Sequence, residues 1–465
     1  MKRVMIAGTR SGCGKTTVTC AILQALINRG CDVTSFKCGP DYIDPMFHSS
    51  VIGAPAYHLD GFFCSRDTVG YLLQKYTREI AVIEGVMGFY DGVGHAVPNA
   101  VGHAVSNAVG RTASSYELAQ DTRTPVILVI DGKGIGQSLG AVMYGYLHYQ
   151  TPNPIIGCIF NRLPDSMVET TQQLCNRMHV TYFGRLPVND HCRIESRHLG
   201  LVTAAEIADL KKKMQALARL AEEHLRLDAL LDAAECPSLS ACQPPVVGSL
   251  TERGVKIAVA CDKAFCFYYQ ENLDLLREIG CEILPFSPLT DTALPRHASG
   301  LLLGGGYPEL YAETLSQNSA MRRDIREKIS AGLPVLAECG GFMYLHREME
   351  TKSGEVFPMA GVIDGKCYPT DRLRRFGYIH VTAAEDNLIC RGGDTLPAHE
   401  FHYWDSDSCG SGFTARKASS GMEYACLHAT DTLCAGFPHF YFYAHPDIAL
   451  RFARRCEIYH KEHNA

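Results

Sequence analysis

Short, strand-like runs alternate with longer segments of helical length over the first half of the chain. The mainly apolar runs occur at 3–7, 33–37, 80–83, 126–130 and 155–160. Runs of this length, bounded by polar turns, are typical of strands. Because they alternate with helices, they predict an α/β fold in which helices cover both faces of a parallel sheet.

The composition changes near residue 236. Residues 236–253 are rich in Pro and Ser and lack helical periodicity, which is typical of a linker. A new strand-like run at 255–260 opens a second α/β series, and 465 residues are too many for one hydrophobic core. We therefore predict three parts: a first domain over 1–235, a linker over 236–253 and a second domain over 254–465.

Charge and hydropathy narrow the classes of partner. The formal net charge of −6 gives no reason to expect a nucleic-acid partner, so an acidic substrate must be bound by local basic groups. No apolar run approaches the roughly 18–20 residues that cross a bilayer, and the N-terminus lacks a signal-peptide pattern. We therefore predict a cytoplasmic protein without a membrane partner, and a homodimer stays an open alternative.

Most of the chain's twenty cysteines are predicted to be small buried side chains in a reducing cell, because no two form a Cys-x-x-Cys pair.

A near-exact tandem octad occupies residues 93–100 and 101–108. Its two histidines, His95 and His103, raise the alternative of a metal site. The repeat is too short for a repeat architecture, so we predict a duplicated surface loop beside Asp91.

A glycine-rich segment, Gly8–Thr17, lies between a predicted strand and a predicted helix. Backbone N–H groups at the start of such a helix attract phosphates, and glycines let the chain approach them closely. The Gly-x-Gly-Lys-Thr-Thr form is similar to that of dethiobiotin synthetase-like and MinD-like proteins. The residues expected to bind nucleotide are Gly12, Gly14, Lys15, Thr16 and Thr17, with Lys15 on the β- and γ-phosphates and Thr16 on magnesium.

Acidic residues follow the second and third strands, at the edge where open α/β sheets bind ligands. Glu84 comes directly off a buried apolar run, where a carboxylate needs a cation to offset its lost hydration. Magnesium is the expected cation, and a structural salt bridge is the alternative. Weaker candidates, for which turn capping is the alternative, are Asp41, Asp44, Asp60 and Asp91.

A second site is predicted around Cys339, which stands between a strand and a helix start and is followed by two glycines. A cysteine on such an elbow is expected to be exposed, and the helix N-terminus favours its thiolate. Backbone N–H groups near Gly340, Gly305 and Gly306 are candidates for binding an oxyanion or glutamine. A nucleophilic cysteine also needs a base, and the candidates are His439, His399 and His402.

Taken together, these motifs resemble those of cobyrinate a,c-diamide synthases, in the same order and over both halves of the chain. The most specific are Gly-Pro-Asp-Tyr-Ile-Asp at 39–44 and Ala-Glu-Cys-Gly-Gly at 337–341. The matching segments lie at 8–17, 36–44, 83–92, 197–201, 286–289, 303–310, 337–345, 375–378 and 399–403.

The resemblance implies a ligase with two sites. A dethiobiotin synthetase-like domain would use ATP to phosphorylate the a and c acetate carboxylates of cobyrinic acid, and a class I glutamine amidotransferase domain would supply ammonia from L-glutamine, in cobalamin biosynthesis. His439 falls where that family keeps its base. The implied magnesium ligands are Thr16, Asp44 and Glu84. The implied substrate and acyl-phosphate contacts are Lys37, Asp41, Tyr42, Asp60 and Asp91.

The chain departs from the family pattern around its base. Many class I amidotransferases carry a glutamate two residues after the histidine, where this chain has Tyr441, and Ala398 and Trp404 replace a usual Gly and Ser. These changes leave open a ligase that uses free ammonia. Hydrogenobyrinate and nickel sirohydrochlorin are alternative substrates with the same acetate groups. A ParA/MinD-like ATPase switch is the alternative from another class, although it has no use for Cys339.

Overall fold

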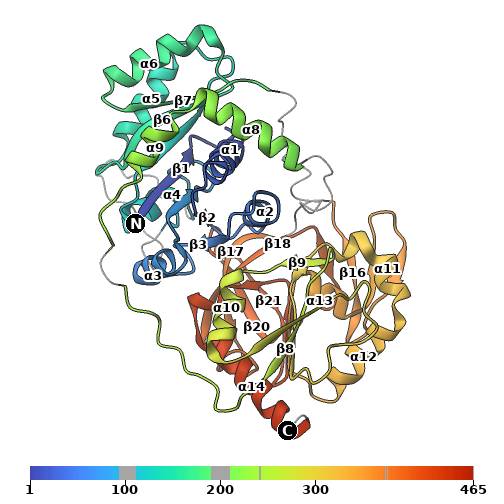
Figure 1. The fold of residues 1–465 in the computed structure, drawn as a ribbon. Coiled ribbons are helices and arrows are strands. Elements are labelled where there is room, and N and C mark those ends of the chain that lie inside the picture. The colour runs from blue at the N-terminus through green and yellow to red at the C-terminus, as the bar shows by residue number, and fades with distance from the viewer. Residues whose placement is uncertain (94–111, 190–209, 240–241, 372, 374, 464–465) are drawn as a thin grey trace. The chain divides into compact units, whose positions relative to one another are not determined.

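The computed structural model describes residues 1–93, 112–189, 210–239, 242–371, 373 and 375–463. The motif at 197–201 and all but the first residue of the octad repeat lie outside the described residues. The chain forms two compact units, Met1–Pro244 and Pro245–Ala465 (Figure 1). In the part of the chain that the structure describes, no helix is long and apolar enough to cross a membrane.

The first unit is built on a seven-stranded sheet with the strand order β3-β2-β4-β1-β5-β6-β7. Every pairing in it is parallel, which confirms the predicted α/β fold. The edge strands β3 and β7 were not predicted, because polar residues interrupt their short apolar pattern. The strands are β1 (Lys2–Gly8), β2 (Val33–Cys38), β3 (Ala56–Leu59), β4 (Ile80–Glu84), β5 (Val126–Asp131), β6 (Ile155–Asn161) and β7 (Thr181–Leu186).

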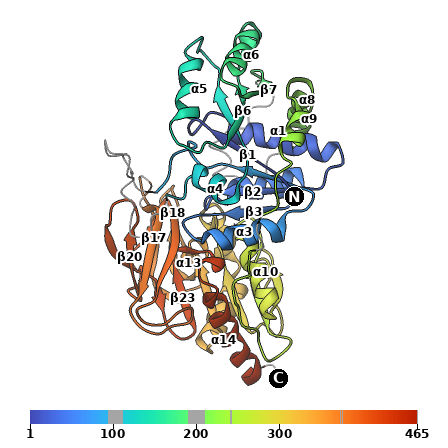
Figure 2. The same cartoon turned by 90° about the vertical axis from the view of Figure 1, so that its left-hand side faces the viewer.

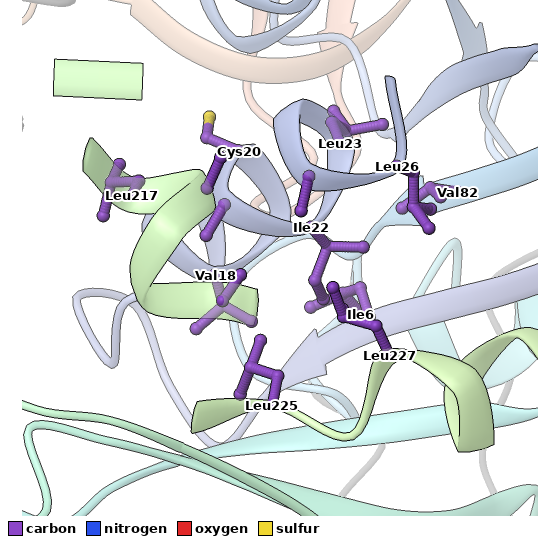
Figure 3. Packing of buried hydrophobic residues seen from close by; sticks show 14 of the residues in the cluster. Ile6, Val18, Cys20, Ile22, Leu23, Leu26, Val82, Leu217, Leu225 and Leu227 are labelled. Atoms are coloured by element: carbon purple, nitrogen blue, oxygen red, sulfur yellow. The ribbon is translucent and has the colours of Figure 1, made fainter. Parts of the chain in front are cut away.

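Helix α1 (Lys15–Asn28) starts at the end of the glycine-rich loop and is buried along most of its length. It packs on β1, β2 and β4 and on α8 (Leu210–His224). Figure 3 shows Val18, Cys20 and Ile22 of α1 and Leu217 of α8 among the buried side chains of this core. The other helical elements of the unit are α2 (Ile43–Phe47), η1 (His48–Ile52), α3 (Arg66–Tyr76), α4 (Ser115–Thr122), α5 (Leu139–His148), η2 (Asp165–Met167), α6 (Val168–Arg177) and α9 (Leu227–Ala233).

The second unit contains a six-stranded sheet with the order β10-β8-β11-β13-β23-β22. Its first five strands are parallel, and the edge strand β22 is antiparallel. Strand β13 ends one residue before Cys339, at the carboxyl edge of this sheet. The strands are β8 (Lys256–Ala260), β10 (Glu282–Phe286), β11 (Gly300–Leu303), β13 (Val335–Glu338), β22 (His428–Ala429) and β23 (Leu433–Gly436).

Three further sheets of the described residues, in which every pairing except β14 with β16 is antiparallel, complete this unit, and the sequence did not predict them. Figure 2 shows β17, β18 and β20 of a five-stranded sheet side by side. Its strands are β17 (Arg375–Ala383), β18 (Thr395–His402), β20 (Phe413–Lys417), β21 (Glu423–Cys426) and β24 (His439–Phe440). The smaller sheets are β9 (Phe265–Phe267) with β12 (Gly305–Gly306), and β14 (His346–Glu350), β15 (Val356–Pro358), β16 (Ile363–Pro369) and β19 (Trp404–Ser406).

Helices of the second unit lie between these strands in sequence, as expected for an α/β series. The short helix α13 (Gly340–Leu345) directly follows Cys339 and is fully buried. The remaining helical elements are α10 (Gln270–Ile279), η5 (Pro308–Tyr311), α11 (Ala312–Gln317), α12 (Ser319–Ser330), η6 (Phe442–Ala444) and α14 (Asp447–His463).

Candidate active sites

The phosphate loop follows β1 and leads into the first turn of α1, where Lys15, Thr16 and Thr17 lie. Gly12 and Gly14 have φ values of 76° and 98°, a left-handed conformation that favours glycine. A Cβ on Gly14 would lie 1.9 Å from Asn161 Nδ2, so this close approach also excludes a side chain. The loop therefore has the backbone geometry that a phosphate-binding turn requires.

Lys15 is buried over the loop, and its ammonium donates hydrogen bonds to the carbonyl oxygens of Arg10, at 3.2 Å, and Met87. Met87 has φ 44°, an unfavourable conformation for a residue with a side chain. Burial lowers the pKa of Lys15, although nearby acidic groups oppose the shift. Burial removes water from this ammonium, so an anion bound at the loop would stabilise its charge.

A buried acid–base cluster lies beside the loop, where the parallel sheet pairs Lys37 of β2 with Glu84 of β4. Lys37 Nζ is 3.1 Å from Glu84 Oε1 and also donates to Asp44. The Thr16 hydroxyl donates to the same Glu84 Oε1 at 2.7 Å. The structure thus brings together the three predicted magnesium ligands and Lys37.

Electrostatics in this cluster follow from burial and from the mutual charges. Burial and then Glu84 raise the pKa of Asp44 well above its usual range. Burial opposes the charge on Glu84, but Lys37 and His48 outweigh it and lower the pKa of that carboxyl. Burial likewise opposes the charge on Lys37, and Asp44 and Glu84 raise the pKa of its ammonium. Two carboxylates face one lysine here, which is an environment that attracts a further cation.

His48 belongs to the same cluster and was missed from the sequence. Its Nε2 is 3.3 Å from Glu84 Oε2, and its Nδ1 is 2.8 Å from the Ser35 hydroxyl. The ring is fully buried and faces the second oxygen of Glu84. The signal in the sequence was its place four residues after Asp44, because residues at that spacing on a helical segment share one face.

Asp60 and Asp91 accept hydrogen bonds from backbone N–H groups in their own turns, which is the role given as the alternative to a substrate contact. Asp60 Oδ1 accepts hydrogen bonds from the backbone N–H of Phe62 at 2.7 Å and of Phe63 at 3.2 Å. Asp91 Oδ2 accepts one from Gly88 at 2.8 Å. Their carboxylates thus hold the turns of loops that follow β3 and β4.

Asp41 and Tyr42 lie in the loop between β2 and α2, next to the acid–base cluster. Asp41 Oδ1 accepts a hydrogen bond from the N–H of Ile43 at 2.9 Å, and the charge of Asp41 contributes to the raised pKa of Lys37. The Tyr42 ring contacts His58 edge to face, with centroids 6.0 Å apart. The loop therefore places the Asp41 carboxylate near Lys37 and the Tyr42 ring against His58.

Two arginines share one carboxylate beside the phosphate loop, and the sequence did not predict this arrangement. Arg10 Nη2 lies 3.1 Å from Asp131 Oδ2, and Arg162 Nε donates to Asp131 Oδ1 at 3.0 Å. Arg162 Nη2 also donates to the Gly12 carbonyl at 3.4 Å. One carboxylate between two guanidinium groups leaves a net positive charge at the loop, which favours an anionic ligand.

In the second unit, Cys339 occupies a strained elbow between β13 and α13, with φ 47° and ψ −103°. Its N–H donates to the Gly436 carbonyl at 2.7 Å, which ties the elbow to the end of β23. The cysteine is 6% exposed, so the predicted exposed thiol is wrong. The next residue is packed as closely, because a Cβ on Gly340 would lie 2.9 Å from Pro308 Cδ at the start of η5.

The glycine candidates form one wall of the thiol site. A Cβ on Gly340 would lie 3.0 Å from the Gly306 nitrogen, and a Cβ on Gly305 would lie 2.6 Å from His439 Cε1. Glycine is therefore needed at 305 to leave room for the imidazole and at 340 to let the two loops approach. The Gly306 nitrogen thus lies next to the residue that follows Cys339, and backbone N–H groups of this wall stay candidates for an oxyanion site.

His439 lies against Cys339 on the short strand β24. Its Nδ1 is 3.4 Å from Glu338 Oε2, and Glu338 Oε1 accepts a hydrogen bond from the Phe440 N–H at 3.1 Å. Burial opposes the imidazolium, but Cys339 and Glu338 outweigh it and raise the pKa of His439 to about 10. Glu338 was not among the residues predicted from the sequence. Its signal was a charged residue at the end of a buried strand, next to the nucleophile candidate.

The competing histidines have other surroundings. His399 of β18 is the cross-strand partner of His439, and burial lowers its pKa to about 3. His402 stacks on Phe437 with centroids 3.9 Å apart, and burial lowers its pKa to about 4. Both rings are therefore neutral near pH 7, whereas His439 carries a proton beside the thiol.

Both units of the chain are similar to known protein families. Residues 4–202 match the CobQ/CobB/MinD/ParA nucleotide binding domain, and residues 256–445 match the CobB/CobQ-like glutamine amidotransferase domain. A cobyrinate a,c-diamide synthase of Listeria innocua is 37% identical and aligns with 97% of this chain and 98% of its own length. Those of Caldanaerobacter subterraneus, at 34% identity, and Salmonella typhimurium, at 35%, align with 98% and 96% of both chains.

Proposed function

The chain belongs to the family of cobyrinate a,c-diamide synthases, and from this premise we propose that it converts the a and c acetate carboxylates of cobyrinic acid into amides with ATP and glutamine. As a glutamine-dependent amidoligase it needs one site that activates an acid and one that releases ammonia. The observation that carries the proposal is the presence of both. A phosphate loop lies beside the buried Glu84 cluster in one unit, and Cys339 lies against His439 in the other.

Ammonia would come from glutamine at the thiol site. The Cys339 thiolate attacks the carboxamide carbon of glutamine, and backbone N–H groups of the glycine wall stabilise the oxyanion. The imidazolium of His439 gives its proton to the departing nitrogen, so ammonia leaves and a thioester remains. Water, deprotonated by His439, then hydrolyses the thioester to glutamate and restores the thiol.

Carboxylate activation would take place at the phosphate loop. An acetate oxygen of the substrate attacks the γ-phosphorus of ATP, which forms an acyl phosphate and ADP. Ammonia then attacks the acyl carbon, phosphate leaves, and a proton passes from the nitrogen to give the amide. Lys15 and Lys37 offset the negative charge of the transferring phosphoryl group, and the loop amides orient the other phosphates.

The donor set beside the loop fits a magnesium ion. Among the described residues, no three His, Cys, Asp or Glu side chains form a metal site, but magnesium in nucleotide sites usually takes one or two carboxylates plus phosphates. Glu84 and Asp44 would supply the carboxylates and Thr16 its hydroxyl. When bound, the ion would neutralise charge on the β- and γ-phosphates. The raised pKa of Asp44 fits such a place, because a cation would favour its ionised form.

Substrate contacts are proposed for the residues around the cluster. Asp41 and Tyr42 are closest in sequence to it, while Asp60 and Asp91 would act by shaping the loops that they cap. Arg10 and Arg162 add positive charge for an anionic ligand. An ATPase switch of the ParA/MinD type would leave the Cys339 site without a task.

The decisive experiment offers ATP, magnesium and glutamine with each candidate acid separately, namely cobyrinic acid, hydrogenobyrinate and nickel sirohydrochlorin. Mass spectrometry counts the amide groups that each product gains. We expect two amides on cobyrinic acid. Amidation of only one of the other acids would replace the proposed substrate, and no amidation together with no glutamine hydrolysis would refute the proposal.

A further inference from the structure

The base at the thiol site needs a group that orients its ring, and the usual glutamate two residues later is absent. Tyr441 occupies that position, is fully buried and packs edge to face on Tyr269 with centroids 5.0 Å apart. We infer that Glu338, on another strand and directly before Cys339, is the positioning residue for His439. This inference rests on the proposed role of Cys339 and His439 in glutamine hydrolysis.

The contacts of Glu338 hold the base at two points. Its Oε2 faces His439 Nδ1 at 3.4 Å, and its Oε1 accepts the N–H of Phe440 at 3.1 Å. One carboxylate therefore lies at ion-pair distance from the imidazole and accepts a hydrogen bond from the backbone N–H that follows it. Glu338 is 6% exposed and His439 is 2% exposed, so little water competes for these contacts.

The fold explains how a residue next to the nucleophile can reach the base. Strand β13 pairs in parallel with β23, and the register places Glu338 opposite Gly436, three residues before His439. The elbow at Cys339 then turns the chain sharply, with φ 47°. Because of this turn, the side chains of Glu338 and Cys339 both contact the same imidazole.

The chemical task is to keep one nitrogen of His439 protonated and aimed. A carboxylate at Nδ1 fixes the tautomer, so the other nitrogen is left for the thiol and the departing ammonia. The same carboxylate stabilises the imidazolium that pairs with the thiolate. In the usual arrangement a glutamate two residues after the histidine performs this task. Here Glu338 performs it, about a hundred residues before the histidine.

Other titratable groups packed near His439 do not duplicate this role. His399 and His402 of β18 have pKa values lowered to about 3 and 4 by burial, so they stay neutral through the working pH range. Burial raises the pKa of Glu400, whose carboxylate accepts the Tyr424 hydroxyl. Glu338, in contrast, has its Oε2 3.4 Å from His439 Nδ1.

The test is the Glu338→Gln variant of the full chain, assayed for glutamine hydrolysis across pH and for amidation with free ammonia. We expect kcat for glutamine hydrolysis to fall about 10²–10⁴-fold, with KM within a few-fold of wild type. Loss of the carboxylate lowers the pKa of His439, so the alkaline limb of kcat/KM should move roughly 1–3 pH units lower. Ammonia-dependent amidation should persist.

Two further variants separate positioning from a structural effect. Glu457→Gln removes another buried carboxylate of the same unit, one that accepts hydrogen bonds from Thr251 and Glu252, and should leave the alkaline limb in place. Glu338→Asp keeps a carboxylate one methylene short, so it should lower kcat but hold the limb near its wild-type pH. This variant decides the matter if Glu338→Gln does not fold, and a wild-type kcat in it would refute positioning.

The failures of the two proposals are distinguishable. If wild-type protein does not hydrolyse glutamine, the proposed glutaminase site is wrong and Glu338 has no base to orient. If wild type hydrolyses glutamine and Glu338→Gln keeps kcat within about threefold and an unmoved pH limb, the glutaminase stands and the positioning role is refuted.

Discussion

Lys37 and Glu84 are register partners on neighbouring parallel strands, and their side chains meet at 3.1 Å beside the phosphate loop. The two residues are 47 positions apart in sequence. Their pairing places a cation against the carboxylate that Thr16 also contacts. The sheet therefore holds one buried carboxylate between a lysine and the first turn of α1, where nucleotide and magnesium are proposed to bind.

Replacing Glu84 by Gln should weaken the magnesium dependence of amidation. Even indirect partners of metal sites typically contribute 10–100-fold to affinity, so loss of a direct carboxylate should raise the half-saturating magnesium concentration at least about tenfold. The measurement is ATP-dependent amidation with free ammonia, titrated with magnesium. Asp32→Asn removes an exposed carboxylate that pairs with Arg78 in the same unit and serves as control. An unchanged titration in Glu84→Gln would assign Glu84 to a structural salt bridge.

Lys15→Ala should stop amidation with either nitrogen source. The ammonium of Lys15 is the cation that the loop directs toward the transferring phosphoryl group, and a loss of roughly 10²–10³-fold is expected for a group of this kind. Glutamine hydrolysis measured without the acid substrate should continue, because it depends on Cys339. Lys2→Ala, at the opposite end of β1, is the matched control. Retained amidation in Lys15→Ala would contradict the phosphate-loop assignment.

The sequence predicted elements whose pattern is local. Strand β1, the glycine loop and α1 follow one another within 28 residues, so their hydrophobic period and glycine spacing were sufficient. The same is true of the elbow at Cys339, where strand, cysteine and helix start are consecutive. Such features need no knowledge of tertiary contacts.

Contacts between distant segments were not predictable in this way. Glu338 lies near His439 because β13 pairs with β23, and β24 follows β23. This pairing of distant strands cannot be predicted from a local sequence pattern. His48 reaches Glu84 through the packing of a short helical segment on the sheet. The close approach of Gly340 to Pro308 likewise joins residues more than thirty positions apart. From the sequence, Tyr441 was seen in place of the glutamate that usually supports the base His439. The carboxylate of Glu338, on another strand, was missed.

Cys339→Ala should abolish glutamine-dependent amidation and leave ammonia-dependent amidation largely intact, because the nucleophile and the phosphate loop belong to different units. Both activities are followed by product mass, with glutamate release measured in parallel. Cys261→Ala, an exposed cysteine of the same unit, should behave as wild type. Loss of both activities in Cys339→Ala would contradict separate sites. Wild-type protein that amidates only with ammonia would identify a ligase without glutaminase activity.

Gly305→Ala should impair glutamine hydrolysis by displacing His439. The added Cβ would lie 2.6 Å from His439 Cε1 and 3.3 Å from Phe267, so the imidazole must move. A displacement on the order of 1 Å at a catalytic group costs about 10²-fold, and we expect glutamine-dependent kcat to fall by at least tenfold. Ammonia-dependent amidation reports whether the protein is folded and should not change.

Gly145→Ala is the control for this substitution, because a Cβ at Gly145 on α5 would meet no atom within 4 Å. It should leave glutamine hydrolysis at the wild-type rate. If Gly305→Ala hydrolyses glutamine as fast as wild type, the imidazole does not need its observed position, and the assignment of His439 as the base would fail. If Gly305→Ala is slow and His439→Asn is equally slow, the ring position seen here is the catalytic one.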